Sequence, residues 1–285
     1  MSGPQCCENP PALNPNSGEG TVEDFGGLKS YLSGSLDSKA AVLLVCDIFG
    51  FEAPNLRKLA DKIAAEGYYV VVPEFMHGDP YDPEDAARPL MVWLKDHGAD
   101  KGFEEALPIV ETIKSKGFST IGAAGFCWGA KVVVELGKAG YIQAAVLCHP
   151  SFVTVDDIKE VKVPIAVLGA EIDQISPPAL VTQFEGVLSV EGYVKIFPGV
   201  AHGWTVRYDL ADAEAVKNAE EAHQNMLEWF AKVCEHHFGK RLSHAFQSYQ
   251  ELLIRCTYWK RIGDILQFEF DLDTVALLLT AFSGS

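Results

Sequence analysis

The sequence GFCWG at residues 125–129 is the segment whose residue types most directly suggest chemistry. It follows an apolar run typical of a strand, residues 120–124, and precedes a helical pattern that begins at Trp128. The two glycines permit a sharp strand-to-helix turn that lifts the central side chain above a sheet. A helix N-terminus beneath it favours a thiolate and offers a main-chain N–H group to an oxyanion. We interpret Cys127 as a candidate nucleophile; the alternative is a buried cysteine in a glycine-rich turn.

An acid and a histidine follow two later apolar runs of strand length. Asp173 follows residues 163–169, and His202 follows residues 193–197. Nucleophile, acid and histidine occur in this chain order in α/β-hydrolases, each at the carboxyl end of a strand. An aspartate in a loop is by itself an ordinary turn former. All three in order and in context predict a Cys127–His202–Asp173 triad.

Two neighbouring residues leave alternatives open. Glu171 lies two residues before Asp173 and is a rival for the acid position. His149 follows the apolar run at residues 144–148. It is a candidate for lining the pocket, and the alternative is a histidine at a strand end whose hydrogen bonds are satisfied within the protein.

The elements that must position these residues alternate regularly between residues 21 and 234. Strand-like apolar runs followed by amphipathic stretches are typical of βαβ units. They predict an α/β-hydrolase fold, a mainly parallel sheet with helices on both faces. Strands are expected at residues 22–32 (a pair turning at Gly26-Gly27), 41–48, 69–72, 120–124, 144–148, 163–168 and 193–197. Helices are expected at residues 54–66, 83–97, 102–116, 128–137, 178–189 and 212–233.

The chain divides into three parts by composition. Residues 1–20 are rich in Pro, Asn, Gly and Ser, which predicts a flexible N-terminal arm. Residues 21–234 form the α/β domain. Residues 235–285 lose the strand–helix rhythm, so an atypical C-terminal extension is expected there.

Composition restricts the class of protein. The formal net charge of −16 argues against binding a phosphate backbone, so no nucleic-acid partner is expected. No signal peptide pattern opens the sequence and no apolar run approaches about 20 residues, so a cytoplasmic protein without membrane attachment is expected. Seven cysteines without framework spacing fit reduced thiols. Cys6 and Cys7 suggest a metal site, but no CxxC spacing or histidine lies near them in the sequence.

From about residue 20 to 234 the chain resembles the dienelactone hydrolase (carboxymethylenebutenolidase) family. The resemblance rests on CDIFGF at residues 46–51, GFCWGA at 125–130, the Asp173 loop, and HGWTVR at 202–207. The opening QCCENPPALNPNSGEG is further similar to plant and fungal members. The resemblance implies the α/β-hydrolase fold and hydrolysis of a small ester or lactone.

The resemblance also implies roles for individual residues. Cys127 corresponds to the nucleophile, His202 to the base and later acid, and Asp173 to the residue that orients His202. The main-chain N–H groups of Ile48 and Trp128 correspond to the oxyanion hole.

Three further residues correspond to binding or modulating positions. Arg207 matches a family arginine that binds a substrate carboxylate, and Arg88 lies near the position of a second one. Asp47 stands where bacterial members carry a glutamate that holds the resting thiol. A carboxylate beside Cys127 is expected to raise the thiol pKa.

These observations favour acyl transfer through a Cys127 thioester, with a small-molecule ester or lactone substrate that can carry a carboxylate. No cofactor and no metal are expected, and the chain is expected to be a monomer or a small homo-oligomer. One alternative is glycan hydrolysis, because some plant relatives are named endo-1,3;1,4-beta-D-glucanases, with Asp47 and Glu171 as carboxylates to recruit. Another is a redox-sensing or binding protein that uses Cys127 as a reactive thiol.

Overall fold

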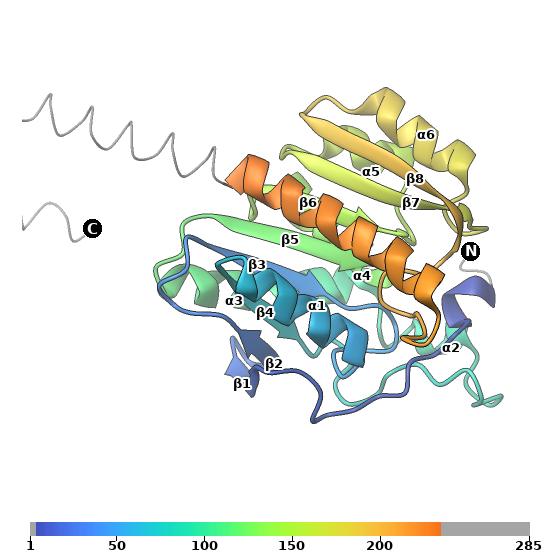
Figure 1. Cartoon of the computed structure of the whole chain (residues 1–285), viewed down its shortest axis with the longest axis horizontal. Coiled ribbons are helices and arrows are strands. Elements are labelled where there is room, and N and C mark those ends of the chain that lie inside the picture. The colour runs from blue at the N-terminus through green and yellow to red at the C-terminus, as the bar shows by residue number, and fades with distance from the viewer. Residues whose placement is uncertain (1–3, 235–285) are drawn as a thin grey trace, which may run out of the picture. The chain divides into compact units, whose positions relative to one another are not determined.

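A computed structural model describes residues 4–234, and its centre is one eight-stranded sheet (Figure 1). The strand order is β1-β2-β4-β3-β5-β6-β7-β8. β1 and β2 form an antiparallel hairpin, β2 pairs antiparallel with β4, and all other neighbours are parallel. The strands are β1 (Thr21–Phe25), β2 (Leu28–Ser33), β3 (Ala40–Val45), β4 (Tyr68–Pro73), β5 (Ile121–Phe126), β6 (Ala144–Cys148), β7 (Ile165–Ile172) and β8 (Gly192–Ala201). The prediction of a mainly parallel sheet is confirmed.

Helices cover both faces of this sheet. Figure 1 shows α1 and the helix over residues 213–234 on one face, and α3 and α4 on the other. The helices are η1 (Pro4–Cys7, a 3-10 turn), α1 (Pro54–Ala65), α2 (Leu90–Trp93), α3 (Ala99–Ser115), α4 (Trp128–Ala139), α5 (Val155–Glu160) and α6 (Pro178–Val187). Sequence periodicity had not indicated the short helix α5, which opens on a capping box formed by Thr154 and Asp157.

The central strands are buried along their whole length, as expected for strands with helices on both sides. Every residue of β3, β4, β5 and β6 is buried. The helix over residues 213–234 seats Phe230 directly over Gly122 of β5, where an added Cβ would lie 2.7 Å from the Phe230 ring. The glycine therefore allows this helix to pack closely on the sheet.

The expectation of a helix over residues 83–97 is wrong for most of that range, because only α2 is helical there. The Asp82 and Asp85 side chains accept hydrogen bonds from main-chain N–H groups two residues ahead. Such local bonds stabilise turns in place of a helix. Pro89 then marks the position at which helical structure can begin.

The parallel register aligns the carboxyl ends of the last four strands. Phe126 of β5 pairs with Cys148 of β6, which pairs with Leu168 of β7. Ile172 at the end of β7 pairs with Ala201 at the end of β8. The loops that follow these strands consequently meet at one edge of the sheet.

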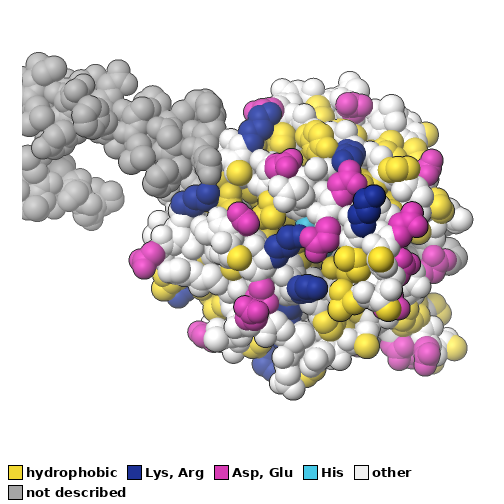
Figure 2. Space-filling view, viewed as in Figure 1, with side chains coloured by type: hydrophobic (Ala, Val, Ile, Leu, Met, Phe, Trp, Pro, Cys, Tyr) yellow, Lys and Arg dark blue, Asp and Glu magenta, His cyan; other side chains and the backbone are white. Residues whose placement is uncertain are grey.

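The surface over α1 and the helix over residues 213–234 carries interspersed acidic and basic side chains (Figure 2). Lys62 of α1 pairs there with Glu220, and Lys195 of β8 pairs with Glu221 at 2.7 Å. No helix among residues 4–234 combines the length and apolar character needed to cross a membrane. The expected extension at residues 235–285 lies outside the described part of the chain.

Candidate active site

Cys127 occupies a strained turn between β5 and α4. Its φ of 52° and ψ of −110° are rare for a residue other than glycine. An added Cβ at Gly125 would lie 2.3 Å from the carbonyl oxygen of Gly129, and one at Gly129 would lie 2.2 Å from that of Val45. Strand and helix thus approach too closely for side chains at either position. This is the strand–turn–helix elbow that the GFCWG sequence predicts.

His202 and Asp173 form a hydrogen-bonded pair beyond the ends of β8 and β7. His202 Nδ1 lies 2.8 Å from Asp173 Oδ2, and neither side chain is exposed. Asp173 Oδ1 accepts hydrogen bonds from the main-chain N–H groups of Ile175 and Ser176. With Oδ1 occupied by two donors, Oδ2 accepts from the imidazole, so Nδ1 carries a proton and Nε2 is the acceptor in the neutral form of the ring. Nε2 and the Cys127 sulfur lie within 4.8 Å of each other.

Burial and charge give these groups unusual pKa values. Burial favours neutral Asp173, but hydrogen bonds from His202 and the main chain outweigh it and lower the Asp173 pKa. Burial disfavours the imidazolium, but interactions with Cys127 and Asp173 outweigh it and raise the pKa of His202 to about 9. Burial, aided by a hydrogen bond with Cys6, raises the pKa of Cys127 well above its usual value. Burial thus favours the neutral thiol form of Cys127.

Ile48 and Trp128, the predicted oxyanion-hole residues, lie in adjoining segments. Trp128 opens α4, so its N–H belongs to the first-turn donors that lack a partner within a helix. Ile48 lies in the turn that follows β3. An added Cβ at Gly129 would lie 2.2 Å from the Val45 oxygen and 2.5 Å from the Cys46 oxygen. The end of β3 and the first turn of α4 are consequently in direct contact.

Arg207 and Asp47 form a buried ion pair in the same region. Arg207 Nε lies 3.3 Å from Asp47 Oδ2, while Asp47 Oδ1 accepts a hydrogen bond from the N–H of Phe49. Burial raises the Asp47 pKa despite the opposing charge of Arg207. Gly203 leaves room for the guanidinium, since an added Cβ would lie 2.3 Å from Arg207 Nη2. Within residues 4–234, Nη2 has no hydrogen-bond partner, which leaves a buried donor suited to an anionic ligand.

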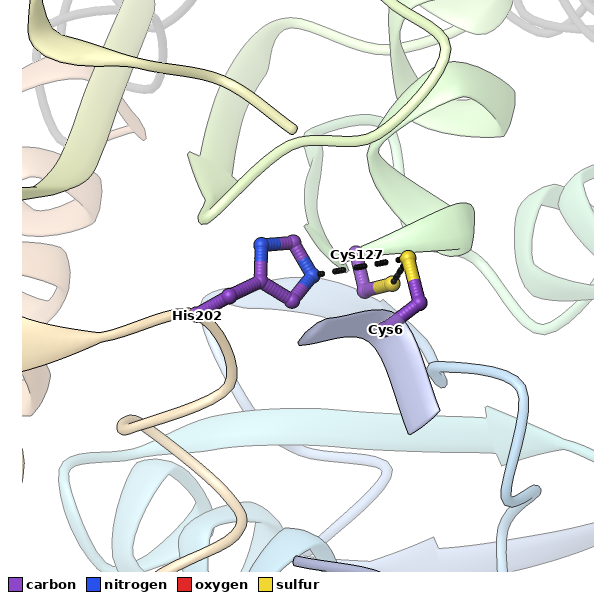
Figure 3. Close-up of side chains that lie close together, drawn as sticks. All are labelled: Cys6, Cys127 and His202. Carbon is purple, nitrogen blue, oxygen red and sulfur yellow. Dashed lines mark hydrogen bonds between the residues drawn. The ribbon is translucent and has the colours of Figure 1, made fainter. Parts of the chain in front are cut away.

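The N-terminal turn η1 places Cys6 against Cys127 (Figure 3). Cys6 Sγ lies 3.6 Å from Cys127 Sγ and 4.0 Å from His202 Nε2. Ser151 Oγ completes the cluster, 3.2 Å from the Cys127 sulfur and 3.4 Å from the Cys6 sulfur. Asp47 was expected beside the thiol, but it pairs with Arg207, and the Cys127 sulfur contacts Cys6 and Ser151.

Specific polar contacts hold η1 in place. Arg207 Nη1 donates to the carbonyl oxygens of Cys6 and Glu8, at 2.8 and 2.7 Å. Gln5 donates to the Ile172 carbonyl and accepts from the N–H of Gln174. The expectation of a flexible arm over residues 1–20 did not include these contacts, because arm composition carries no information about a buried arginine some 200 positions away.

A groove of about 900 Å³ adjoins the site. Pro10 and Pro11 line one side of it, and His202, Trp204, Arg207 and Tyr208 line another. Cys127 itself is fully buried under η1. His202 and Arg207 are among the residues that line this groove although their side chains are buried, and the Cys127 sulfur is covered.

Comparison with known proteins identifies the family. The family model described as "Dienelactone hydrolase family" matches residues 28–234. A human protein named carboxymethylenebutenolidase homolog is 34% identical over 228 residues, which cover 73% of this chain and 93% of that protein. The chain belongs to the dienelactone hydrolase family. The predicted resemblance and the prediction of an ester or lactone hydrolase of this type are confirmed.

One further relative and one solved structure show how far the similarity extends. A maize protein named endo-1,3;1,4-beta-D-glucanase is 43% identical over 190 residues, 65% of this chain but only 61% of that protein. The solved structure of a putative dienelactone hydrolase from Klebsiella pneumoniae has a TM-score of 0.63 at 22% identity, covering 75% of this chain and 97% of that one. The structural likeness confirms the predicted α/β-hydrolase fold.

Within this dienelactone hydrolase domain, two sequence candidates bind partners other than the residues around Cys127. Arg88 pairs with Asp79 and Asp96 in a partly exposed ion-pair group, so its guanidinium is already engaged by carboxylates. Glu171 is exposed and accepts a hydrogen bond from the N–H of Gly199. Of the two acids considered, Asp173 is the one that contacts His202.

Three residues of the site escaped sequence reasoning or were left open by it. Ser151 and His149 both follow β6, so the strand-end rule could have located Ser151 as it located His149. His149 is fully buried, bonds Thr205 Oγ1 at 2.8 Å and packs edge-on against His202. Cys6 has no comparable signal, because only tertiary contacts bring it to the site.

Proposed function

We propose that the protein hydrolyses small esters or lactones through a thioester on Cys127. The observation that carries this proposal is a strained elbow cysteine next to a fully buried histidine–aspartate pair. A nucleophile, a base and an orienting acid within reach of one another form the arrangement required for covalent acyl transfer.

In the first half of the reaction, Cys127 attacks the substrate carbonyl and its thiol proton passes to His202 Nε2. The oxyanion that forms is stabilised by the N–H groups of Ile48 and Trp128. Collapse of the tetrahedral intermediate breaks the ester C–O bond, and His202 returns the proton to the departing alkoxide. Asp173 keeps the proton on Nδ1 and stabilises the imidazolium.

In the second half, His202 removes a proton from water, and the resulting hydroxide attacks the thioester. The C–S bond then breaks, the acid leaves, and Cys127 recovers its proton from His202. A thiolate is a good leaving group, so activated esters and enol lactones suit this site better than amides.

Arg207 selects the substrate class. Its Nη1 atom binds two main-chain carbonyl oxygens of η1, and its Nη2 atom is a buried donor beside the groove. A substrate carboxylate can accept from both atoms when the η1 carbonyls withdraw. We therefore propose substrates with a carboxylate near the scissile carbonyl.

The name of the maize relative supports a second candidate, hydrolysis of a mixed-linkage glucan. That chemistry normally uses two carboxylates on either side of the glycosidic bond. In this site Asp173 is bound to His202, Asp47 is bound to Arg207, and both are buried. The site geometry favours the ester hydrolase.

Parallel assays separate the two candidates. Purified protein is supplied with p-nitrophenyl acetate, with a carboxylate-bearing enol lactone, and with mixed-linkage β-glucan. We expect turnover of the first two that disappears in Cys127→Ala and His202→Ala. Release of reducing sugar that persists in Cys127→Ala, without ester turnover in the wild-type protein, would reject the proposal.

A further inference from the structure

Three atoms of types that bind metals come from distant parts of the chain and lie close together at the elbow of Cys127. They are Cys6 Sγ, Cys127 Sγ and His202 Nε2, all within 4.8 Å of one another and all buried. Figure 3 shows the two sulfurs and the imidazole nitrogen directed toward the same small space. Of these three residues the proposed reaction uses Cys127 and His202, and it does not account for Cys6.

We propose that Cys6, Cys127 and His202 bind one Zn²⁺ or a similar thiophilic cation, and that the bound metal holds the hydrolase inactive. The inhibition of hydrolysis by the bound metal rests on the proposed function, whereas the metal site itself does not.

The spacing of the three atoms fits a tetrahedral ion. Zn–S bonds of about 2.3 Å and Zn–N bonds of about 2.0–2.1 Å at tetrahedral angles place two sulfurs about 3.8 Å apart, and a sulfur and a nitrogen about 3.6 Å apart. The observed separations are 3.6 Å between the sulfurs and 4.0 Å between Cys6 Sγ and His202 Nε2. Cys127 Sγ and His202 Nε2 lie within 4.8 Å of each other, so side-chain movements of up to about 1 Å bring all three atoms to the spacing of a tetrahedral ion.

The surroundings also suit a metal. The other ring nitrogen of His202, Nδ1, donates a hydrogen bond to Asp173. This carboxylate–histidine pairing orients imidazole ligands at zinc sites. Two thiolates balance the charge of a divalent cation, and the neighbouring Arg207–Asp47 pair adds no net charge. Both thiol protons leave for solvent when the ion binds. Three protein ligands leave a fourth position, beside Ser151, for water.

The bound ion would inhibit in two ways. It takes the sulfur lone pair that attacks the carbonyl and the nitrogen that accepts the thiol proton. It also ties η1 to the elbow through Cys6, in addition to the hydrogen bonds from Arg207 to Cys6 and Glu8. Substrate would then have to displace both the metal and η1.

The test uses the full-length protein, reduced and freed of metal, titrated with Co²⁺ and Zn²⁺. Co²⁺ reports thiolate ligands by a near-ultraviolet charge-transfer band and a tetrahedral site by its visible absorption. We expect one Co²⁺ per chain with a two-thiolate spectrum, displaced by one equivalent of Zn²⁺. Competition with a chromophoric chelator gives the Zn²⁺ affinity, and p-nitrophenyl acetate turnover is followed in the same titration.

Variants assign the ligands. Cys6→Ser should weaken Zn²⁺ binding by about 100-fold or more and remove the zinc sensitivity of turnover, while the matched control Cys7→Ser should behave as wild type. Asp173→Asn should weaken binding by about 10- to 100-fold through the imidazole.

Absence of a thiolate–cobalt band in wild type, or equal loss of affinity in Cys6→Ser and Cys7→Ser, overturns the metal site. Zn²⁺ binding that leaves ester turnover unchanged overturns only the proposal that the metal inhibits the hydrolase. Because binding is measured without turnover, a protein that proves inactive on every ester still tests the site.

Discussion

Replacing Asp173 with asparagine should reverse the tautomer of His202. Asp173 Oδ1 accepts from the N–H groups of Ile175 and Ser176, so the carbonyl oxygen of an asparagine is held at that position. Its amide nitrogen then faces His202 Nδ1, where a donor meets a donor. The imidazole relieves this by moving its proton to Nε2, which can no longer accept the Cys127 proton.

The kinetic effect follows from the lost base. General acid–base catalysis contributes about 10²- to 10⁴-fold, so kcat/KM for an activated ester should fall by a factor in that range. In the wild-type enzyme the pKa of His202 is about 9, so kcat/KM should rise with pH toward that value. In Asp173→Asn the rise of the residual activity should move to lower pH, because the Asp173 share of the interactions that raise the His202 pKa is gone.

Stability should change with pH in a defined direction. Raising the His202 pKa from 6.5 to about 9 corresponds to about 3 kcal/mol, shared between Cys127 and Asp173. This stabilisation is complete below pH 6.5 and is lost as pH rises through about 9. The lowered Asp173 pKa adds stability that is present above 3.8 and lost in acid. Asp173→Asn should therefore cost about 1–3 kcal/mol near pH 6 and much less near pH 10.

Stopped-flow ester hydrolysis across pH 6–10 and urea unfolding at its two ends measure both effects. Glu171→Gln is the matched control, since Glu171 lies two residues away, is exposed and accepts a hydrogen bond from the N–H of Gly199. We expect it to stay within about twofold of wild type, as for surface substitutions. An Asp173→Asn enzyme within threefold of wild type, or a Glu171→Gln enzyme as impaired as Asp173→Asn, would refute the assigned acid.

Three other perturbations test the site. Cys6→Ala should lower the pKa of Cys127, since the Cys6 hydrogen bond raises it. The shift is measured by iodoacetamide labelling of Cys127 as a function of pH, followed by peptide mapping, and an unchanged pH profile would contradict the contact. Arg207→Gln should raise KM about 10-fold or more for a carboxylate-bearing ester but not for its neutral counterpart, whereas Arg88→Gln should affect neither; equal effects on both esters would contradict the binding role. Gly129→Ala should lower the free energy of unfolding in urea by more than about 3 kcal/mol, because its Cβ would lie 2.2 Å from a β3 carbonyl oxygen. A decrease in the free energy of unfolding below about 1 kcal/mol would show that the elbow can relax.

Local sequence patterns predicted the elements that carry the reacting groups. Apolar runs ending in glycine or proline located β5, β7 and β8, and the strand-end rule then singled out Cys127, Asp173 and His202. This works because a parallel sheet with helices on both faces leaves few ways to place the ends of its strands.

The parts that were not predicted depend on which partner a side chain meets in the folded chain. Cys6 meets Cys127 only because Arg207 and Gln5 fix η1 over the elbow, and arm composition does not encode that contact. Arg88 was expected to bind substrate, but in the folded chain its guanidinium pairs with Asp79 and Asp96. Neither pairing leaves a periodic signal in the sequence: Cys6 contacts a residue 121 positions away, and Arg88 pairs with carboxylates nine and eight positions away.

Trapping of the acyl-enzyme tests the proposed chemistry most directly. The protein is mixed with an activated ester for milliseconds to seconds, quenched in acid, and measured by intact mass spectrometry with peptide mapping. The thioester mechanism predicts one acyl group per chain, on the Cys127 peptide, that forms and decays at rates consistent with turnover and is missing in Cys127→Ala. Turnover without any adduct, or an adduct on the Cys6 peptide that survives in Cys127→Ala, would contradict it.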